Sequence, residues 1–102
     1  MELLTKKILN KLPALNATEK IPTPKKVAQV KFFCPWDSWT WYAVEYSPGD
    51  KLFFGLVYGL EKEWGHFSLD ELESIQGPVG LKIERDLNFK PCSIAKLEAE
   101  LE

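Results

Sequence analysis

The spacing of apolar residues predicts a helix near the start of the chain. Leu4, Ile8 and Leu12 recur every four residues, which places them on one face of a helix over residues 3–12. Residues 13–26 begin with a proline, and a proline disfavours helical geometry in the residue before it. This stretch contains three prolines and predicts an irregular arm.

Runs of apolar, aromatic and β-branched residues follow the arm. They cover residues 27–34, 39–46, 52–58 and 63–67. Such runs favour β-strands, and the short segments between them contain the turn-forming residues Pro, Gly, Asp and Ser. Connections of this length join antiparallel neighbours, so the sequence predicts an antiparallel β-meander.

A helix over residues 68–76 has the strongest local signal in the chain. Ser68 and Glu71 have the spacing of a capping box. In this arrangement the Ser68 hydroxyl accepts a hydrogen bond from the backbone N–H of Glu71, and the Glu71 carboxylate reaches back to the Ser68 N–H. We expect the helix to end at Gly77-Pro78, because glycine favours a helix end and proline cannot continue the helix.

Apolar and polar residues alternate after this helix, which predicts a further extended segment. The apolar row consists of Leu81, Ile83, Leu87 and Phe89. Arg85 interrupts the row, so it must either pair with a carboxylate or lie where the row reaches an opening. Residues 92–102 predict a short C-terminal helix, capped by Ser93 and frayed at its end.

These elements together predict an α+β fold in a single domain over residues 1–102. Its sheet is an antiparallel meander of about four to five strands. The N-terminal helix, the capped helix near 68–76 and the C-terminal helix pack with this sheet. Along the chain the division is a helix and irregular arm (1–26), the sheet with the capped helix (27–91), and the C-terminal helix (92–102).

The charge of the chain is unevenly distributed. The net charge is -2, which is the wrong sign for a protein that holds nucleic acid mainly through phosphates. Residues 1–31 carry +5, whereas residues 32–102 carry -7. We interpret the N-terminal lysines as solvated residues that flank a loop, and a contact with nucleic acid is the alternative.

Length and hydrophobicity bound the class of protein. The 102 residues are 45% hydrophobic, which is enough for one core. No apolar run approaches the ~20 residues that a membrane-spanning helix needs, and the basic start lacks the apolar stretch of a signal peptide. We therefore expect a cytoplasmic protein with no membrane contact.

Few residues are candidates for nucleophiles or metal ligands. Cys34 and Cys92 form no C-x-x-C pair, so we expect separate thiols, with a single disulfide between them as the alternative. His66 is the only histidine, and we expect its imidazole to pack in a strand beside Trp64. These spacings match no recognised metal site, and we predict no catalytic residue, metal or cofactor.

An aromatic cluster is the main candidate for an interaction surface. Trp36, Trp39, Trp41 and Tyr42 lie within seven positions. Since Trp39 and Trp41 share one strand face and Tyr42 lies on the other, one thin layer cannot bury them all. We expect some of this surface to be accessible, as in protein interfaces or in stacking platforms for single-stranded nucleic acid. The alternative is a thick core covered by the first and last helices.

The charged cluster Glu84, Arg85 and Asp86 completes the predicted surface. An arginine within an apolar row is either a buried ion-pair anchor or a contact for an anionic partner. Glu84 and Asp86 also allow a second chemistry, because two nearby carboxylates are candidate ligands for a metal ion.

Short segments spread over nearly the whole chain, up to Pro91, combine into a family pattern. The most specific are Trp39-Thr40-Trp41-Tyr42, Phe53-Phe54-Gly55-Leu56-Val57, Phe67-Ser68-Leu69 and Ile83-Glu84-Arg85-Asp86-Leu87. With these segments the chain resembles domain of unknown function twenty-nine fifty-eight, a set of small bacterial proteins often encoded on plasmids and other mobile elements. The resemblance implies a bacterial cytoplasmic protein of a mobile-element accessory set and implies no reaction. Asn16 and Cys34 depart from the pattern, where we expect an aromatic residue and a threonine.

The resulting functional hypothesis is a non-enzymatic module that binds an unidentified protein partner. Its contact surface would combine the aromatic strand with the acidic face of the capped helix. One alternative is a single-stranded nucleic-acid-binding protein that uses the aromatic residues and the N-terminal lysines. Another is a small metal-dependent hydrolase or nuclease that uses Glu84 and Asp86. A free edge strand would also allow a homodimer.

Overall fold

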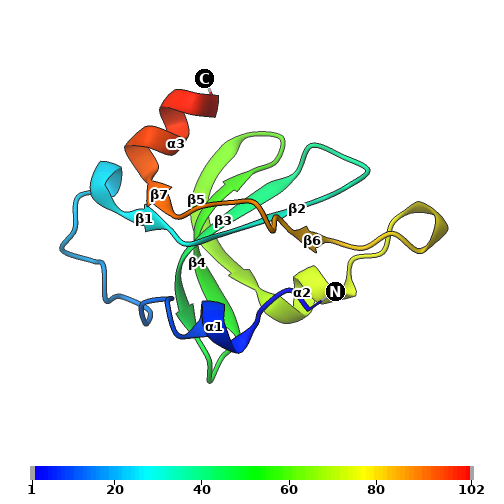
Figure 1. Cartoon of the computed structure of the whole chain (residues 1–102), viewed down its shortest axis with the longest axis horizontal. Coiled ribbons are helices and arrows are strands. Elements are labelled where there is room, and N and C mark those ends of the chain that lie inside the picture. Colours follow the sequence, from blue (N-terminus) through cyan, green and yellow to red (C-terminus); the bar gives the residue numbers. More distant parts are fainter. Residues whose placement is uncertain (1, 102) are drawn as a thin grey trace.

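The protein is built on one antiparallel sheet with the strand order β5-β4-β3-β2-β6 (Figure 1). A computed structural model describes residues 2–101. The strands are β2 (Val30–Phe33), β3 (Thr40–Ser47), β4 (Leu52–Tyr58), β5 (Lys62–Ser68) and β6 (Glu84–Arg85). Strands β2 to β5 pair with their sequence neighbours, which confirms the predicted meander and the α+β class. Strand β5 forms one edge of the sheet, and the homodimer that such an edge would allow stays a prediction.

The predicted strand over residues 27–34 is divided between two sheets. Its first part, β1 (Val27–Ala28), pairs with β7 (Cys92–Ser93), and only its second part belongs to β2. Gln29 lies between the two parts and donates its N–H to the carbonyl of Ala43 at 2.9 Å. The local pattern did not show this break, because the partner strand β7 lies far along the chain.

Helix α1 (Lys6–Leu9) is shorter than the predicted helix over residues 3–12. The Thr5 hydroxyl begins it by accepting a hydrogen bond from the backbone N–H of Ile8 at 3.3 Å. Leu3 lies before this cap and is buried in the core. The apolar spacing therefore extends beyond the helix because the residues before it also pack against the sheet.

Helix α2 (Leu69–Ser74) confirms the predicted cap and corrects the predicted end. The Ser68 hydroxyl accepts a hydrogen bond from the Glu71 N–H at 3.2 Å. The helix ends at Ser74 instead of Gly77-Pro78, because Ile75 is extended (φ -70°, ψ 125°) and packs against the core. The chain then forms the short 3-10 helix η2 (Pro78–Gly80).

Helix α3 (Ile94–Leu101) confirms the predicted C-terminal helix. The Ser93 hydroxyl caps it by accepting a hydrogen bond from the Lys96 N–H at 3.2 Å. It packs near η1 (Thr23–Lys25), a single 3-10 turn within the irregular arm. The predicted fraying concerns the end of the chain, where Glu102 lies outside the described residues.

The extended segment after α2 does not form the single apolar row that the alternation predicted. Leu81 and Leu87 are exposed, whereas Ile83 is buried. Phe89 packs on the opposite face of the sheet from Ile83. The row is broken because the chain turns at Asp86, whose carbonyl accepts a hydrogen bond from the Phe89 N–H at 3.3 Å.

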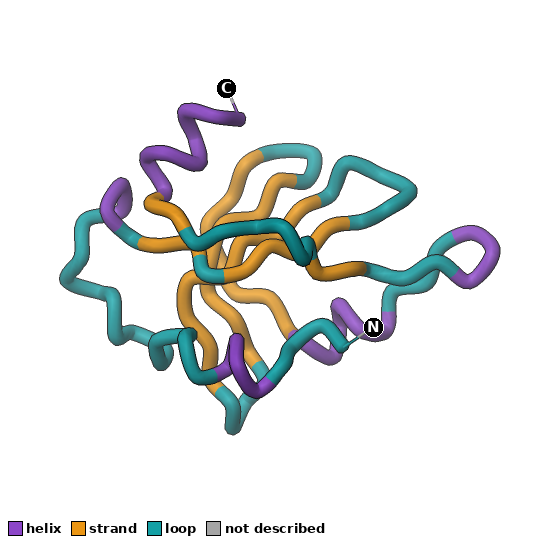
Figure 2. The backbone as a smooth tube through the Cα atoms, in the orientation of Figure 1, coloured by secondary structure: helices purple, strands orange, loops and turns teal. Residues whose placement is uncertain are grey.

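The sheet carries a hydrophobic core on each face. The buried part of the first core is Leu3, Val30, Phe32, Cys34, Trp41, Ala43, Tyr46, Phe53, Phe67, Leu72 and Ile83. That of the second is Ala28, Tyr42, Val44, Leu56, Ile94 and Leu97. The N-terminal segment and α2 contribute to the first core and α3 to the second, and Figure 1 shows α1 and α3 at opposite ends of the molecule. Figure 2 shows that the helices are short pieces at the periphery and that loops make up most of the chain outside the sheets.

Candidate functional site

The four predicted aromatic residues differ in exposure. Trp41 is 8% exposed and Tyr42 is 2% exposed, so both belong to the cores. Trp39 is 37% exposed, and Trp36 is half-buried at the edge of the first core. The accessible aromatic surface is therefore smaller than predicted, because β3 is covered on both faces. Burial raises the pKa of Tyr42 to about 12, with the nearby Tyr58 adding to the shift.

Trp36 and Trp39 are each held against a glycine that is distant in the sequence. A Cβ atom at Gly59 would lie 2.3 Å from the Trp39 ring, and a Cβ atom at Gly77 would lie 2.5 Å from the Trp36 ring. Only a residue without a side chain lets the two indoles lie so close to the backbone. The two tryptophans are thus packed in place although part of their surface remains accessible.

The tryptophans line a shallow apolar hollow at this end of the first core, which we call the tryptophan groove. Its lining residues are Cys34, Trp36, Asp37, Trp39, Trp41, Ile75 and Ile83. Its volume is about 300 Å³. The groove is formed where the loop between β2 and β3 meets the segment that follows α2. Aromatic side chains on such a recessed surface are typical anchors of protein interfaces.

A second hollow adjoins the tryptophan groove on the other side of Trp39. It has a volume of about 290 Å³ and is lined by Trp39, Val57, Leu60, Glu61 and Glu63. Leu60 is 94% exposed. Trp39 thus separates two hollows, and its exposed surface is accessible from both.

The charged cluster on β6 has mainly structural contacts. An Arg85 guanidinium nitrogen donates to the backbone carbonyls of Glu2 at 2.6 Å and Leu3 at 3.1 Å, which fastens the N-terminal segment to the sheet. Asp86 forms an ion pair with Lys31 at 3.6 Å. The sequence analysis offered a carboxylate, an opening or an anionic partner for Arg85, and the contacts with backbone carbonyls were not among these alternatives.

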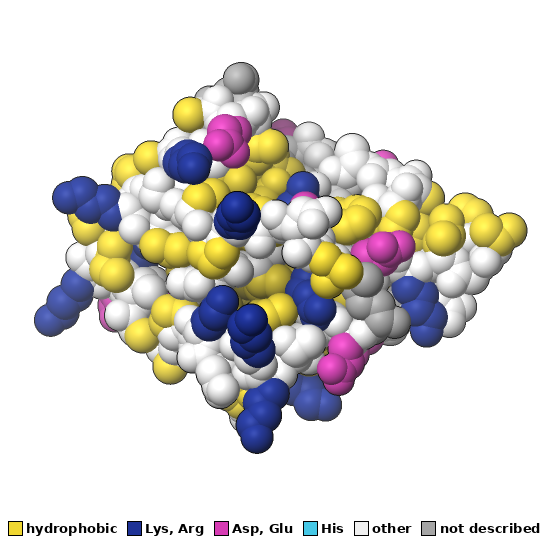
Figure 3. All heavy atoms as spheres, viewed as in Figure 1, with side chains coloured by type: hydrophobic (Ala, Val, Ile, Leu, Met, Phe, Trp, Pro, Cys, Tyr) yellow, Lys and Arg dark blue, Asp and Glu magenta, His cyan; other side chains and the backbone are white. Residues whose placement is uncertain are grey.

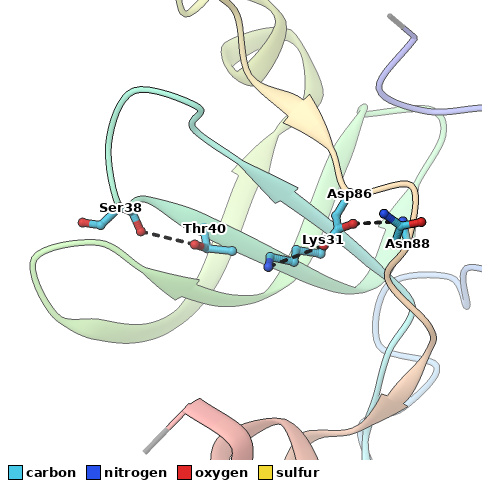
Figure 4. A network of polar contacts seen from close by, with 5 residues as sticks. All are labelled: Lys31, Ser38, Thr40, Asp86 and Asn88. Carbon is cyan, nitrogen blue, oxygen red and sulfur yellow. Dashed lines mark hydrogen bonds and ion pairs between the residues drawn. The ribbon is translucent and has the colours of Figure 1, made fainter.

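A line of polar contacts runs across the same part of the sheet (Figure 4). Asp86 bridges two of them, because its carboxylate pairs with Lys31 and accepts the N–H of Asn88 at 2.9 Å. Nearer the tryptophan groove, the Thr40 hydroxyl donates to the carbonyl of Ser38 at 3.2 Å. These contacts tie down the loop that carries Trp39 and the turn that follows β6.

The potential metal ligands do not come together. Cys34 belongs to the first core and Cys92 packs beside the second, and both thiols are free, as predicted. His66 is exposed, and its ring contacts Phe54 with the centroids 5.2 Å apart. Within residues 2–101, no group of three or more His, Cys, Asp or Glu side chains is close enough to hold a metal ion.

The sequence analysis missed the buried carboxylate of Glu45, which is only 3% exposed. A β-bulge between Ala43 and Glu45 shifts the register and turns this side chain toward the irregular arm. There the carboxylate accepts hydrogen bonds from the backbone N–H of Asn16 at 2.8 Å and from the backbone N–H of Thr18 at 3.0 Å. It also accepts a hydrogen bond from the Thr18 hydroxyl. The ammonium group of Lys26 donates a hydrogen bond to the Thr18 carbonyl.

These contacts determine the protonation of Glu45. Burial alone would raise the pKa of its carboxyl. The hydrogen bonds from Thr18 and Asn16, with the charge of Lys26, outweigh that effect and lower the pKa below its usual value of 4.5. A single acidic residue inside the aromatic run over residues 39–46 was the available signal for such a buried anchor.

The fold and the groove define a small α+β protein with a recessed aromatic surface. The chain belongs to the family described as "Protein of unknown function (DUF2958)", whose profile matches residues 3–97. No curated protein and no solved structure matches the chain. None of the described helices has the length and apolar character needed to cross a membrane.

Proposed function

We propose that the protein is a non-enzymatic module that binds another protein through the tryptophan groove. The observation that carries the proposal is the packing of Trp36 and Trp39 against Gly77 and Gly59. This packing leaves indole surface accessible while it restricts the motion of both rings. Rigid aromatic anchors lose little conformational entropy on binding, which is why they dominate interface energetics.

The charges around the groove favour a protein partner over single-stranded nucleic acid. Asp37, Glu61 and Glu63 lie beside Trp39 and would repel phosphates. Lys6 and Lys7 belong to α1, and Figure 3 shows basic side chains gathered over this part of the surface. A stacking platform needs both aromatic and basic groups along one path, and these two sets belong to different parts of the surface.

The family resemblance points to the biological setting of the module. Proteins of this kind are often encoded on bacterial plasmids and other mobile elements, so we place the module in such an accessory set. A partner from host defence or from plasmid transfer would suit that setting. The acidic residues of α2, Asp70, Glu71 and Glu73, would extend the contact surface beyond the groove.

The test compares capture and affinity for the wild type and two groove variants. Proteins retained from a bacterial lysate are identified and purified, and the dissociation constant of each is then measured. Trp39→Ala removes the anchor, and Gly59→Ala displaces its ring. Loss of a central tryptophan should weaken binding by about thirtyfold or more.

Leu87→Ala is the matched control, because Leu87 is also an exposed apolar residue but lies outside the groove. This variant should bind like the wild type. Equal affinity of the wild type and Trp39→Ala for every retained protein would refute the proposal.

A further inference from the structure

Three carboxylates line the two hollows that meet at Trp39. Asp37 lies in the tryptophan groove, and Glu61 and Glu63 lie in the adjoining hollow. The strand register places Glu63 opposite Val57 and Val57 opposite Trp41, so Glu63 lies on the same face of the sheet as the groove. We call these three residues the acidic rim.

The ion pairs that the structure shows within residues 2–101 join carboxylates outside the acidic rim. The side-chain ion pairs found there join Lys31 to Asp86, Lys51 to Asp70 and Lys62 to Glu98. Lys62 lies between the two rim glutamates in the sequence, but alternation along β5 directs it to the opposite face, where it meets α3. The rim therefore presents negative charge beside a partly exposed indole.

An indole face beside carboxylates is suited to a guanidinium or ammonium group. The ring quadrupole attracts a cation placed over its face, and the carboxylates add attraction of the same sign. Arginine fits better than lysine, because its planar group stacks on the ring and donates to carboxylates with two nitrogens. The floor of the groove, formed by Trp41, Ile75 and Ile83, is apolar and takes an uncharged side chain.

We propose that the occupant of the groove is an extended peptide segment of the partner in which an apolar residue and an arginine are two positions apart, so that both side chains face the protein. The apolar side chain enters the groove, and the arginine stacks on Trp39 and contacts the acidic rim. This inference rests on the proposed function, since it names the chemistry of the partner at that same site. An acidic segment would be repelled by the rim.

Defined peptides test the inference without the natural partner. The probes are acetylated, amidated five-residue alanine peptides with leucine at the second position and arginine, glutamine or glutamate at the fourth, so that both side chains face the same way. Binding is followed by tryptophan fluorescence of the protein and checked by calorimetry. The arginine peptide should bind at least about fivefold more tightly than the glutamine peptide, and the glutamate peptide should bind most weakly.

Two triple variants separate the rim from the overall charge. The rim variant is Asp37→Asn, Glu61→Gln and Glu63→Gln. The control variant, with the same change of net charge at exposed positions away from the groove, is Asp50→Asn, Glu19→Gln and Glu100→Gln. The rim variant should lose about fivefold in affinity for the arginine peptide, and the control variant should stay within twofold.

Salt and the anchor variant complete the test. Raising NaCl from about 20 mM to about 300 mM should weaken the binding of the arginine peptide more than that of the glutamine peptide, because salt screens the charges of the rim. Trp39→Ala should weaken both peptides. Equal binding of the arginine and glutamine peptides, an unchanged affinity of the rim variant, or no binding of the arginine peptide would overturn the inference.

The outcomes also distinguish this inference from the proposed function. A natural partner that loses affinity in Trp39→Ala but not in the rim variant would support the module and refute the arginine-bearing segment. A partner unaffected by either variant would refute the proposed function itself.

Discussion

Replacement of Glu45 tests whether the buried carboxylate anchors the irregular arm. Glu45→Gln keeps the size of the side chain but removes its charge and turns an amide NH₂ group toward donors. In the wild type, the two carboxylate oxygens accept hydrogen bonds from the N–H groups of Asn16 and Thr18 and from the Thr18 hydroxyl. One amide oxygen cannot replace both, so at least one buried donor loses its acceptor.

The magnitude follows from those contacts. A buried donor without a partner costs about 1–3 kcal/mol, and hydrogen bonds to a charged group contribute about 1.5–3 kcal/mol each. We expect Glu45→Gln to lower the free energy of unfolding by about 2–3 kcal/mol. In a chain of 102 residues this loss lowers Tm by about 10–20 °C.

The pH dependence has a definite sign. The folded state lowers the pKa of Glu45 below 4.5, so the charged form is favoured by folding. This stabilisation is fully present above pH 4.5 and is lost as the pH falls through the lowered pKa of the folded state. The difference in stability between the wild type and Glu45→Gln should therefore shrink below pH 4.5.

Urea denaturation followed by tryptophan fluorescence, repeated from neutral to acidic pH, measures this difference. Glu63→Gln is the control, because Glu63 is an exposed carboxylate on the neighbouring part of the sheet and should change stability by less than about 0.5 kcal/mol. The reasoning is refuted if the two variants have equal stability at neutral pH. It is also refuted if the effect of Glu45→Gln does not depend on pH.

Two further predictions concern the backbone. In the urea titration, Gly55→Ala should lower the free energy of unfolding by about 3 kcal/mol or more, because its Cβ would lie 1.9 Å from the carbonyl oxygen of Tyr42. Gly65→Ala is the control and should be tolerated, because no atom lies within 4 Å of its Cβ. Val79 is 97% exposed at φ 48°, which is strained for a β-branched residue. Val79→Asn should raise stability by about 1 kcal/mol, and a lower Tm in calorimetry would contradict this.

The elements that the sequence predicted well are those encoded locally. The run over residues 52–58 became β4 without change, and Ser68 caps α2 as the spacing with Glu71 indicated. Both depend on residues a few positions apart. The family resemblance also held, since the matched profile covers residues 3–97.

The features that the sequence missed depend on partners that are distant along the chain. The strand over residues 27–34 divides because β7 pairs with its first two residues. Trp39 packs against Gly59, and Trp36 packs against Gly77. No local period encodes these contacts, so the sequence identified the aromatic cluster but not which of its members are buried.

For the function, it matters more which residues of the aromatic cluster are exposed than how many aromatic residues the cluster contains. β3 buries side chains on both faces, so Trp41 and Tyr42 are explained by the two cores. Trp39 is not explained in this way, because 37% of it remains exposed. Its ring occupies the space that a side chain at position 59 would fill, so glycine at this position lets the indole lie against the backbone. An indole that is packed against the backbone and still partly exposed is the feature on which the proposed recognition of a partner rests.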